Sequence, residues 1–269
     1  MEGLAPADMT MLRFGVAALL LTPLVLLRCS DKGLGWGRAF SLAVLAGPLF
    51  GLLINTGFGL APLSHAVVLT AGATMLSANA LSWLLGGKRP PIDKLVGMGI
   101  LILGLVVIAS DQQIQSQQPF STVWVGDLCF AGAGALWGTF TYFLGRWNVD
   151  PAVGIGQISL ISAFAFLPAF LAWHSGNSVS MDVWLTQAFF QGVLGGCLGS
   201  IAIAKAVSRL GAAEAALFPA MVPSGALLLA VPMLKEWPSF LEIVGIVICT
   251  LGLLAAFDII RMARRLPPT

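Results

Sequence analysis

The sequence predicts an all-α polytopic membrane protein with about nine transmembrane helices. Of its 269 residues, 58% are hydrophobic and 10% are charged, and the mean hydropathy is +0.92. Soluble domains carry roughly a quarter charged residues, so this chain lacks the charges to cover a soluble surface. Its apolar residues also fall in blocks of about 20, the length of helix that crosses a bilayer. Because backbone groups in lipid must bond within their own segment, these blocks are predicted to be helices.

The predicted spans, in chain order, cover residues 9–27, 39–58, 63–85, 92–110, 124–145, 152–173, 182–204, 210–233 and 239–260. Most connections between them are short and rich in polar residues, Gly or Pro, which is typical of loops. The longest is the Gln-rich segment 111–123, which is predicted to be an external linker. Residues 261–269 are predicted to form a basic cytoplasmic tail.

The positions of Lys and Arg predict the orientation of the chain. If the first span ends in the cytoplasm, twelve of the 14 basic residues face inward and only Arg13 and Lys235 face outward. Such a bias is the positive-inside signal, and it places the C-terminus in the cytoplasm. These basic residues would meet anionic lipid headgroups in the bilayer, so no nucleic-acid partner is expected.

An internal repeat appears when the chain is shifted by 148 residues. At this offset Gly47 and Gly51 align with Gly195 and Gly199, Pro90 with Pro238, and Leu103-Gly104-Leu105 with Leu251-Gly252-Leu253. The repeats are predicted at residues 1–110 and 124–260. An odd number of spans in the repeat would invert its second copy, as in many secondary transporters. The first copy has four helices and the second has five, so we hypothesise that the native chain begins one helix before Met1.

Several segments resemble the drug/metabolite transporter superfamily, in its EamA-type branch. Thr10-Met11-Leu12-Arg13-Phe14 is similar to the family's second helix, Gly126-Asp127-Leu128 with Ala135-Leu136-Trp137-Gly138 to its sixth, and Ala215-Ala216-Leu217 with Lys235-Glu236-Trp237-Pro238 to its ninth and tenth. The resemblance implies ten helices in two inverted five-helix repeats. It also implies a secondary carrier, an exporter of small metabolites or amphiphilic compounds, in the inner membrane of a bacterial cell.

Polar and aromatic residues inside the spans are the candidates for a substrate cavity, because polar groups in lipid are costly. The candidates are Asn55, Thr70, Thr74, Asn79, Trp83, Trp137, Thr141, Tyr142 and Gln157. The alternative is that their hydrogen bonds simply hold neighbouring helices together. Glu214 is a candidate for ion coupling, or else a helix N-terminal residue that pairs with Arg209. The glycine pairs Gly47/Gly51, Gly134/Gly138 and Gly195/Gly199 are predicted to allow close helix contact.

Enzyme motifs do not emerge from the sequence. His65 and His174 lie outside any metal-ligand spacing such as HExxH, and there is no P-loop. The four cysteines lie in separate segments without a CxxC pair. No catalytic residue, cofactor or metal is therefore expected, and the partners would be a small-molecule substrate and the lipid bilayer. Two readings remain open: a carrier, or a non-transporting scaffold or degenerate paralogue. A homo-oligomer also remains open.

Overall fold

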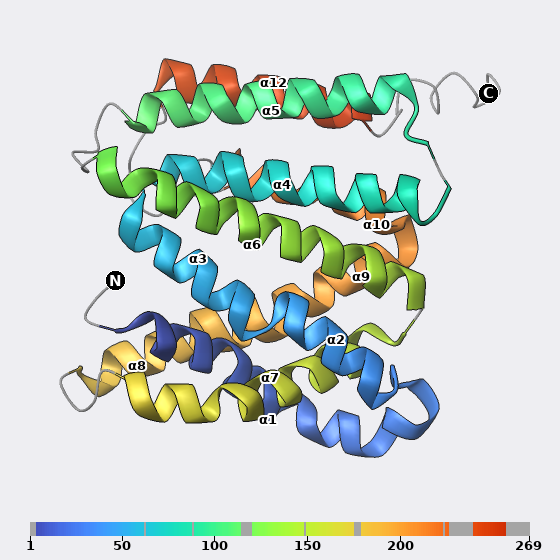
Figure 1. Cartoon of the computed structure of the whole chain (residues 1–269), viewed down its shortest axis with the longest axis vertical. Helices are drawn as coiled ribbons and strands as arrows, with labels where there is room; N and C mark the ends of the chain where they lie inside the picture. The colour runs from blue at the N-terminus through green and yellow to red at the C-terminus, as the bar shows by residue number, and fades with distance from the viewer. Residues whose placement is uncertain are drawn as a thin grey trace, which may run out of the picture. The chain divides into compact units, whose positions relative to one another are not determined.

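A computed structural model describes residues 4–61, 63–87, 89–113, 120–147, 149–174, 179–222, 224–225 and 239–256. Within these ranges every regular element is a helix (Figure 1), which confirms the predicted all-α class. Five described segments are long and apolar enough to cross a membrane: Pro6–Arg28, Trp36–Leu60, Val123–Trp147, Pro151–Trp173 and Met181–Leu210.

Five predicted spans correspond to single helices whose ends lie within five residues of the prediction. These are α1 (Pro6–Lys32), α4 (Leu63–Leu84), α5 (Ile92–Gln113), α6 (Phe120–Trp147) and α7 (Pro151–Trp173). The last predicted span corresponds to α12 (Phe240–Ala256) as far as residue 256. Asp150 caps α7 because its carboxylate accepts from the backbone N–H groups of Ala152 and Val153.

The prediction of one continuous helix over residues 39–58 is wrong. The structure has two helices there, α2 (Trp36–Ala46) and α3 (Pro48–Leu60), separated at Gly47. Pro48 has no N–H to donate to the carbonyl of Val44, four residues earlier. Gly47 leaves the helical conformation at φ −89° and ψ −142°, which starts α3 in a new direction.

The predicted end of the seventh span is also wrong. The helix predicted at 182–204 runs from Met181 to Leu210 as α8 (Met181–Gln187), a π-helix η2 (Ala188–Gly199) and α9 (Ser200–Leu210). Gly211, at φ 96°, ends it in a conformation that favours glycine. The span predicted at 210–233 starts with two short pieces, α10 (Ala212–Ala215) and the 3₁₀-helix η3 (Phe218–Met221).

Parts of several predictions fall outside the described residues. These are the middle of the predicted linker, the second half of the span at 210–233, the turn Lys235–Pro238 and the basic tail. The external linker, the tail and the repeat boundaries stay predictions.

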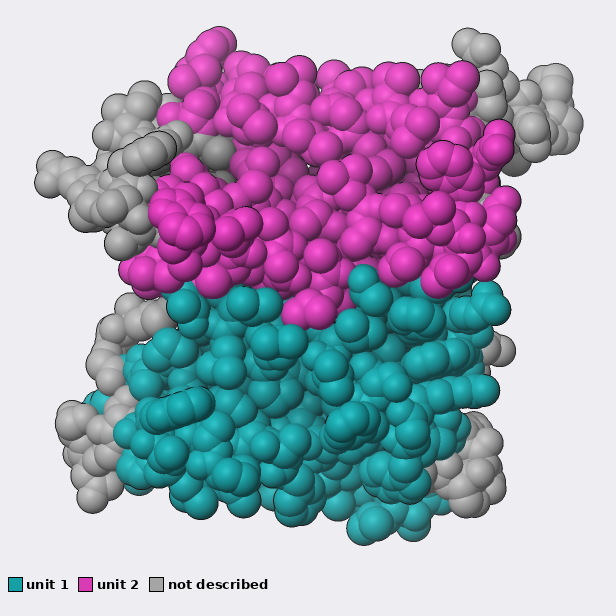
Figure 2. Space-filling view, in the orientation of Figure 1, with its two compact units in different colours: residues 1–56, 139–215 teal, residues 57–138, 216–269 magenta. Residues whose placement is uncertain are grey.

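The described chain forms two compact units, coloured separately in Figure 2. Unit 1 comprises residues 1–56 and 139–215, and unit 2 comprises residues 57–138 and 216–269. Each unit therefore draws helices from both predicted repeats. The boundaries of the two compact units therefore do not coincide with those of the two sequence repeats.

In unit 1, α1 packs against α7 and against the π-helix η2. Phe14 and Ala18 of α1 share a buried cluster with Ala163 of α7. The glycines of η2 that approach α1 are Gly192 and Gly196, beside Val16 and Arg13. The predicted contact through Gly195 and Gly199 is therefore wrong, because the wide π turn presents other glycines to α1.

In unit 2, the core lies between α4, α5, α12 and η3. Its fully buried side chains include Met75, Leu101, Leu105 and Leu217. Helices α5 and α12 lie side by side (Figure 1), and their contacts run in opposite chain directions. Gly97 near the start of α5 meets Ala256 at the end of α12, while Ile108 meets Gly245.

The α5–α12 contacts are reciprocal under the 148-residue repeat. Shifting the pair Gly97–Ala256 by 148 and exchanging the helices gives Gly245–Ile108. The pair Gly104–Cys249 likewise becomes Gly252–Leu101. A surface that pairs with its own equivalent in this way is the signature of a two-fold relationship. Helices α5 and α12, which the repeat predicts to be equivalent, are thus antiparallel neighbours that contact each other through equivalent positions.

The closeness of this contact predicts that Gly104→Ala destabilises the protein. A Cβ at Gly104 would lie 2.7 Å from the Cys249 backbone nitrogen and 2.6 Å from its Sγ, so the helices must separate. We expect a loss of about 1–3 kcal/mol in the free energy of unfolding, measured by denaturant titration in detergent micelles.

The matched control is Gly99→Ala in the same helix, where nothing lies within 4 Å of the added Cβ. This variant should be neutral or slightly stabilising, because Ala favours helix over Gly by about 1 kcal/mol. Equal effects of the two substitutions would contradict the close contact between α5 and α12.

Candidate functional site

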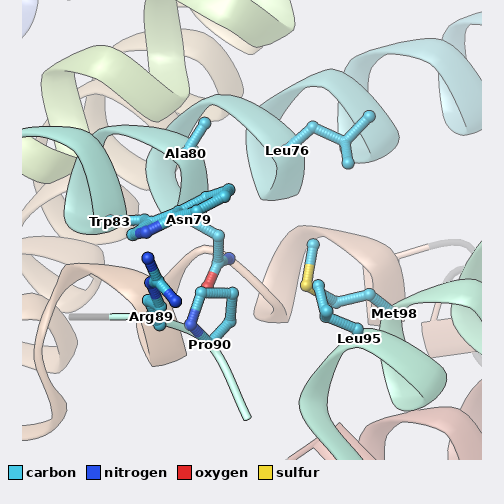
Figure 3. Close-up of a pocket in the computed structure, with 8 residues that line it drawn as sticks. All are labelled: Leu76, Asn79, Ala80, Trp83, Arg89, Pro90, Leu95 and Met98. Carbon is cyan, nitrogen blue, oxygen red and sulfur yellow. The ribbon is translucent and has the colours of Figure 1, made fainter. Parts of the chain in front are cut away.

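A cavity of about 400 Å³ lies in unit 2 where α4 ends and α5 begins (Figure 3). It is lined by Leu76, Asn79, Ala80 and Trp83 of α4, Arg89 and Pro90 of the connection, and Leu95 and Met98 of α5. Ligand sites are usually clefts of roughly 300–1,000 Å³ with mostly apolar walls and few polar groups. This cavity fits that description in size and in lining.

The local sequence explains why the connection folds back onto α4. Gly87 has φ 66° and donates its backbone N–H to the carbonyl of Trp83 at 3.0 Å, which is a glycine C-cap. Pro90 and Pro91 then come directly before α5, where a proline suits the first turn of a helix. The turn brings Arg89 back beside the last turn of α4.

Two polar side chains give the cavity its chemical character. Asn79 is 5% exposed, and its Nδ2 donates to the carbonyl of Met75 at 2.9 Å. Figure 3 shows its amide directed toward Pro90. The guanidinium carbon of Arg89 lies 5.9 Å from the centre of the Trp83 ring, a cation–π arrangement. Among the eight described residues that line the cavity, Arg89 is the one that carries a charge.

Of the predicted cavity residues, Asn79 and Trp83 come together here, whereas Thr70 and Thr74 lie on another face of α4. The hydroxyl of Thr74 donates to the carbonyl of Gly134 in α6 at 3.1 Å. A Cβ on Gly134 would meet the backbone of Thr70, and one on Gly138 would meet the carbonyl of Thr74. These contacts confirm that the Gly134/Gly138 pair allows close packing of α4 and α6.

The remaining predicted residues lie elsewhere. Trp137 is partly buried in α6, within unit 2. Unit 1 contains the others, namely Asn55, Thr141, Tyr142, Gln157 and Glu214. Asn55 donates to the Thr10 hydroxyl at 3.3 Å, and buried Gln157 accepts from the backbone N–H of Leu34 at 2.9 Å. Their roles in a transport cavity stay predictions.

Two of these candidates carry hydroxyl groups that the described protein leaves unbonded. The Thr70 Oγ1 and Tyr142 OH atoms are buried, and no hydrogen-bond partner lies within reach among the described residues. Buried polar groups normally find a partner. Within the described residues, these two hydroxyls are exceptions to that rule.

Sequence reasoning missed a histidine–aspartate pair in unit 2. The His65 Nδ1 lies 2.7 Å from the Asp127 Oδ1, and both side chains are partly exposed. The two residues are 62 positions apart and stand near the starts of α4 and α6. The predicted topology places His65 and Asp127 near the same, outer face of the membrane. This shared position was the one sequence signal for their pairing. Arg89 was also missed as a cavity residue, because it was counted only as an orienting charge.

Comparison with known proteins identifies the family. The model of the EamA-like transporter family matches residues 1–110 and 124–257. The chain belongs to this family. The family match over both halves agrees with the resemblance drawn from the sequence, and it makes the protein an integral, multi-pass member of a family of membrane transporters.

Solved structures show the same fold. Twenty-eight chains match the structure. One of them, described only as the crystal structure of a protein, is 17% identical and superposes with a TM-score of 0.72. The alignment covers 96% of this chain and 89% of the other. No curated protein matches the sequence.

The bond between Gln157 and Leu34 predicts a structural cost for Gln157→Leu. The substitution leaves the Leu34 N–H buried without its acceptor, so we expect a loss of about 1–3 kcal/mol in the free energy of unfolding. Denaturant titration in detergent measures it. Gln187→Leu, at a partly exposed position of α8, is the control and should stay within about 0.5 kcal/mol of the native protein. Native-like stability of the Gln157 variant would show that this bond does not hold α7 to the α1–α2 connection.

Proposed function

We propose that this EamA-family protein is a secondary transporter that exports small metabolites or amphiphilic compounds across the inner membrane of a bacterial cell. The observation that carries the proposal is the match of one transporter family model to both halves of the chain. The excess of Lys and Arg on one side of the predicted topology supports a cytoplasmic C-terminus.

We also propose that the two halves are inverted repeats. The reciprocal, antiparallel contacts of α5 and α12 support this, because equivalent helices of an inverted repeat cross the bilayer in opposite directions. Alternating access would follow from two arrangements of the helices around a substrate site. The cavity beside Asn79 and Trp83 would form part of the substrate route at the cytoplasmic side, the side to which the positive-inside rule assigns the α4–α5 connection.

Flux through reconstituted protein tests the proposal. The full-length native protein in proteoliposomes should give saturable flux of at least one solute from a panel of amphiphilic and zwitterionic metabolites. Absence of flux across the whole panel would favour the alternative, a non-transporting or degenerate membrane scaffold.

Two substitutions test the predicted cavity residues. Asn79→Ala and Trp137→Ala should each lower flux about two- to tenfold, the cost of one lost polar contact, while the amount of folded protein stays unchanged. Trp124→Ala is the control, because Trp124 lies on the same helix as Trp137, its side chain is 58% exposed, and it is not a predicted cavity residue. Native kinetics in both Asn79→Ala and Trp137→Ala would remove these residues from the substrate route.

A further inference from the structure

We propose that the cavity between α4 and α5 binds an anionic amphiphile, with its negative group on Arg89 and its apolar body against Trp83, Leu76 and Leu95. This inference names the class of ligand that the site binds. It rests on the proposed function only where the bound ligand is interpreted as part of transport. The binding itself is a separate claim, and it is measured without transport.

The charge of the cavity favours an anion. Arg89 is the one charged residue among the eight described residues that line the cavity. Its guanidinium lies over the Trp83 ring at 5.9 Å. This cation–π attraction does not use the N–H donors of the guanidinium. These donors match the two oxygens of a carboxylate or phosphate, and charge-assisted bonds of this kind are strong.

The walls of the cavity favour an apolar body. Trp83 is 46% exposed, Leu76 55% and Leu95 50%, so a large apolar surface is uncovered around one cation. Met98 closes the α5 side, and a methionine adapts to irregular shapes. The Asn79 amide adds one polar contact near Pro90 (Figure 3). Apolar walls with one cation and one amide suit a molecule with a single charged end.

The position of the cavity allows two sources of such a ligand. It lies at the end of α4, next to a connection that the positive-inside rule places at the cytoplasmic surface. A solute with a carboxylate would reach it from the cytoplasm. The headgroup and first chain segment of an anionic phospholipid would reach it from the inner leaflet. Both share the chemistry that Arg89 and Trp83 recognise.

Calorimetric titration of the purified full-length protein in a nonionic detergent tests the inference. The probes are 2-naphthoate and its neutral analogue 2-naphthamide, which share one apolar body. We expect naphthoate to bind about tenfold or more tightly than naphthamide, the gain typical of a hydrogen bond to a charged group. Arg89→Gln should abolish that preference, and Trp83→Leu should weaken the binding of both probes.

The matched control is Arg38→Gln. Arg38 lies over the ring of Trp147 at 5.7 Å, the same kind of pair, but neither residue lines this cavity. Its loss should leave both affinities unchanged. An Arg89→Gln variant that keeps the naphthoate preference would overturn the proposal, as would equal binding of the two probes by the native protein.

A second arm separates the two sources. The protein is placed in nanodiscs of phosphatidylcholine with or without phosphatidylglycerol, and the naphthoate titration is repeated. If phosphatidylglycerol lowers naphthoate affinity in the native protein and not in Arg89→Gln, the lipid is an occupant of the cavity. If affinity is unchanged, the occupant is a solute. Naphthoate binding without any flux of solutes would support this site and contradict the proposed function, so the two failures are distinguishable.

Discussion

The contact between α5 and α12 is the interaction on which the structure of unit 2 depends. In a bilayer, lipid tails are as apolar as the side chains, so helices associate through close packing and not through burial from water. Gly97, Gly104, Gly245 and Gly252 let the two backbones meet. The side chains of Leu101, Leu105 and Ile108 are fully buried in one cluster with residues of α4, η3 and α12.

The position of the cavity follows from this arrangement. Helix α5 packs on both α12 and α4, and α4 is also joined to α6 by the Thr74–Gly134 hydrogen bond and the close contact at Gly138. Helices α4 and α5 are joined by a short connection with Gly87 and two prolines, and the cavity lies beside this connection. Asn79 and Trp83 on one side and Leu95 and Met98 on the other are left around an open space.

The sequence predicted most of this fold, because hydrophobic blocks of membrane length have one physical solution, the helix. The ends of α4 and α7 were predicted within one residue. The predictions that were wrong depended on local backbone geometry. A proline at residue 48 marks a kink or a break equally well in the sequence, and the backbone conformation of Gly47, which makes it a break, has no sequence signal. The π turns of η2 have no composition signal, so the glycines that face α1 were assigned wrongly.

The candidate site was predicted only in part, for a similar reason. Thr70 and Asn79 belong to one helix, and the sequence grouped them as polar residues of one span. The structure places Thr70 against α6 and Asn79 toward α5. The two residues are nine positions apart, which is not a whole number of helical turns, so they lie on different faces of α4. Which face of α4 meets which neighbour depends on the packing of the other helices. His65 and Asp127 lie 62 residues apart, and their pairing required the same information.

The central claim is that the two repeats are inverted in the membrane. Labelling equivalent positions of the two repeats from each side of the membrane tests it most directly. Ile92 and Phe240 are 148 residues apart, begin α5 and α12, and are 77% and 79% exposed. In a background with Cys29, Cys129, Cys197 and Cys249 replaced by Ala, each is changed to Cys and treated with a membrane-impermeant maleimide. Inverted repeats predict that Ile92→Cys reacts only from the cytoplasmic side and Phe240→Cys only from the outside. Labelling of both from the same side would contradict the account.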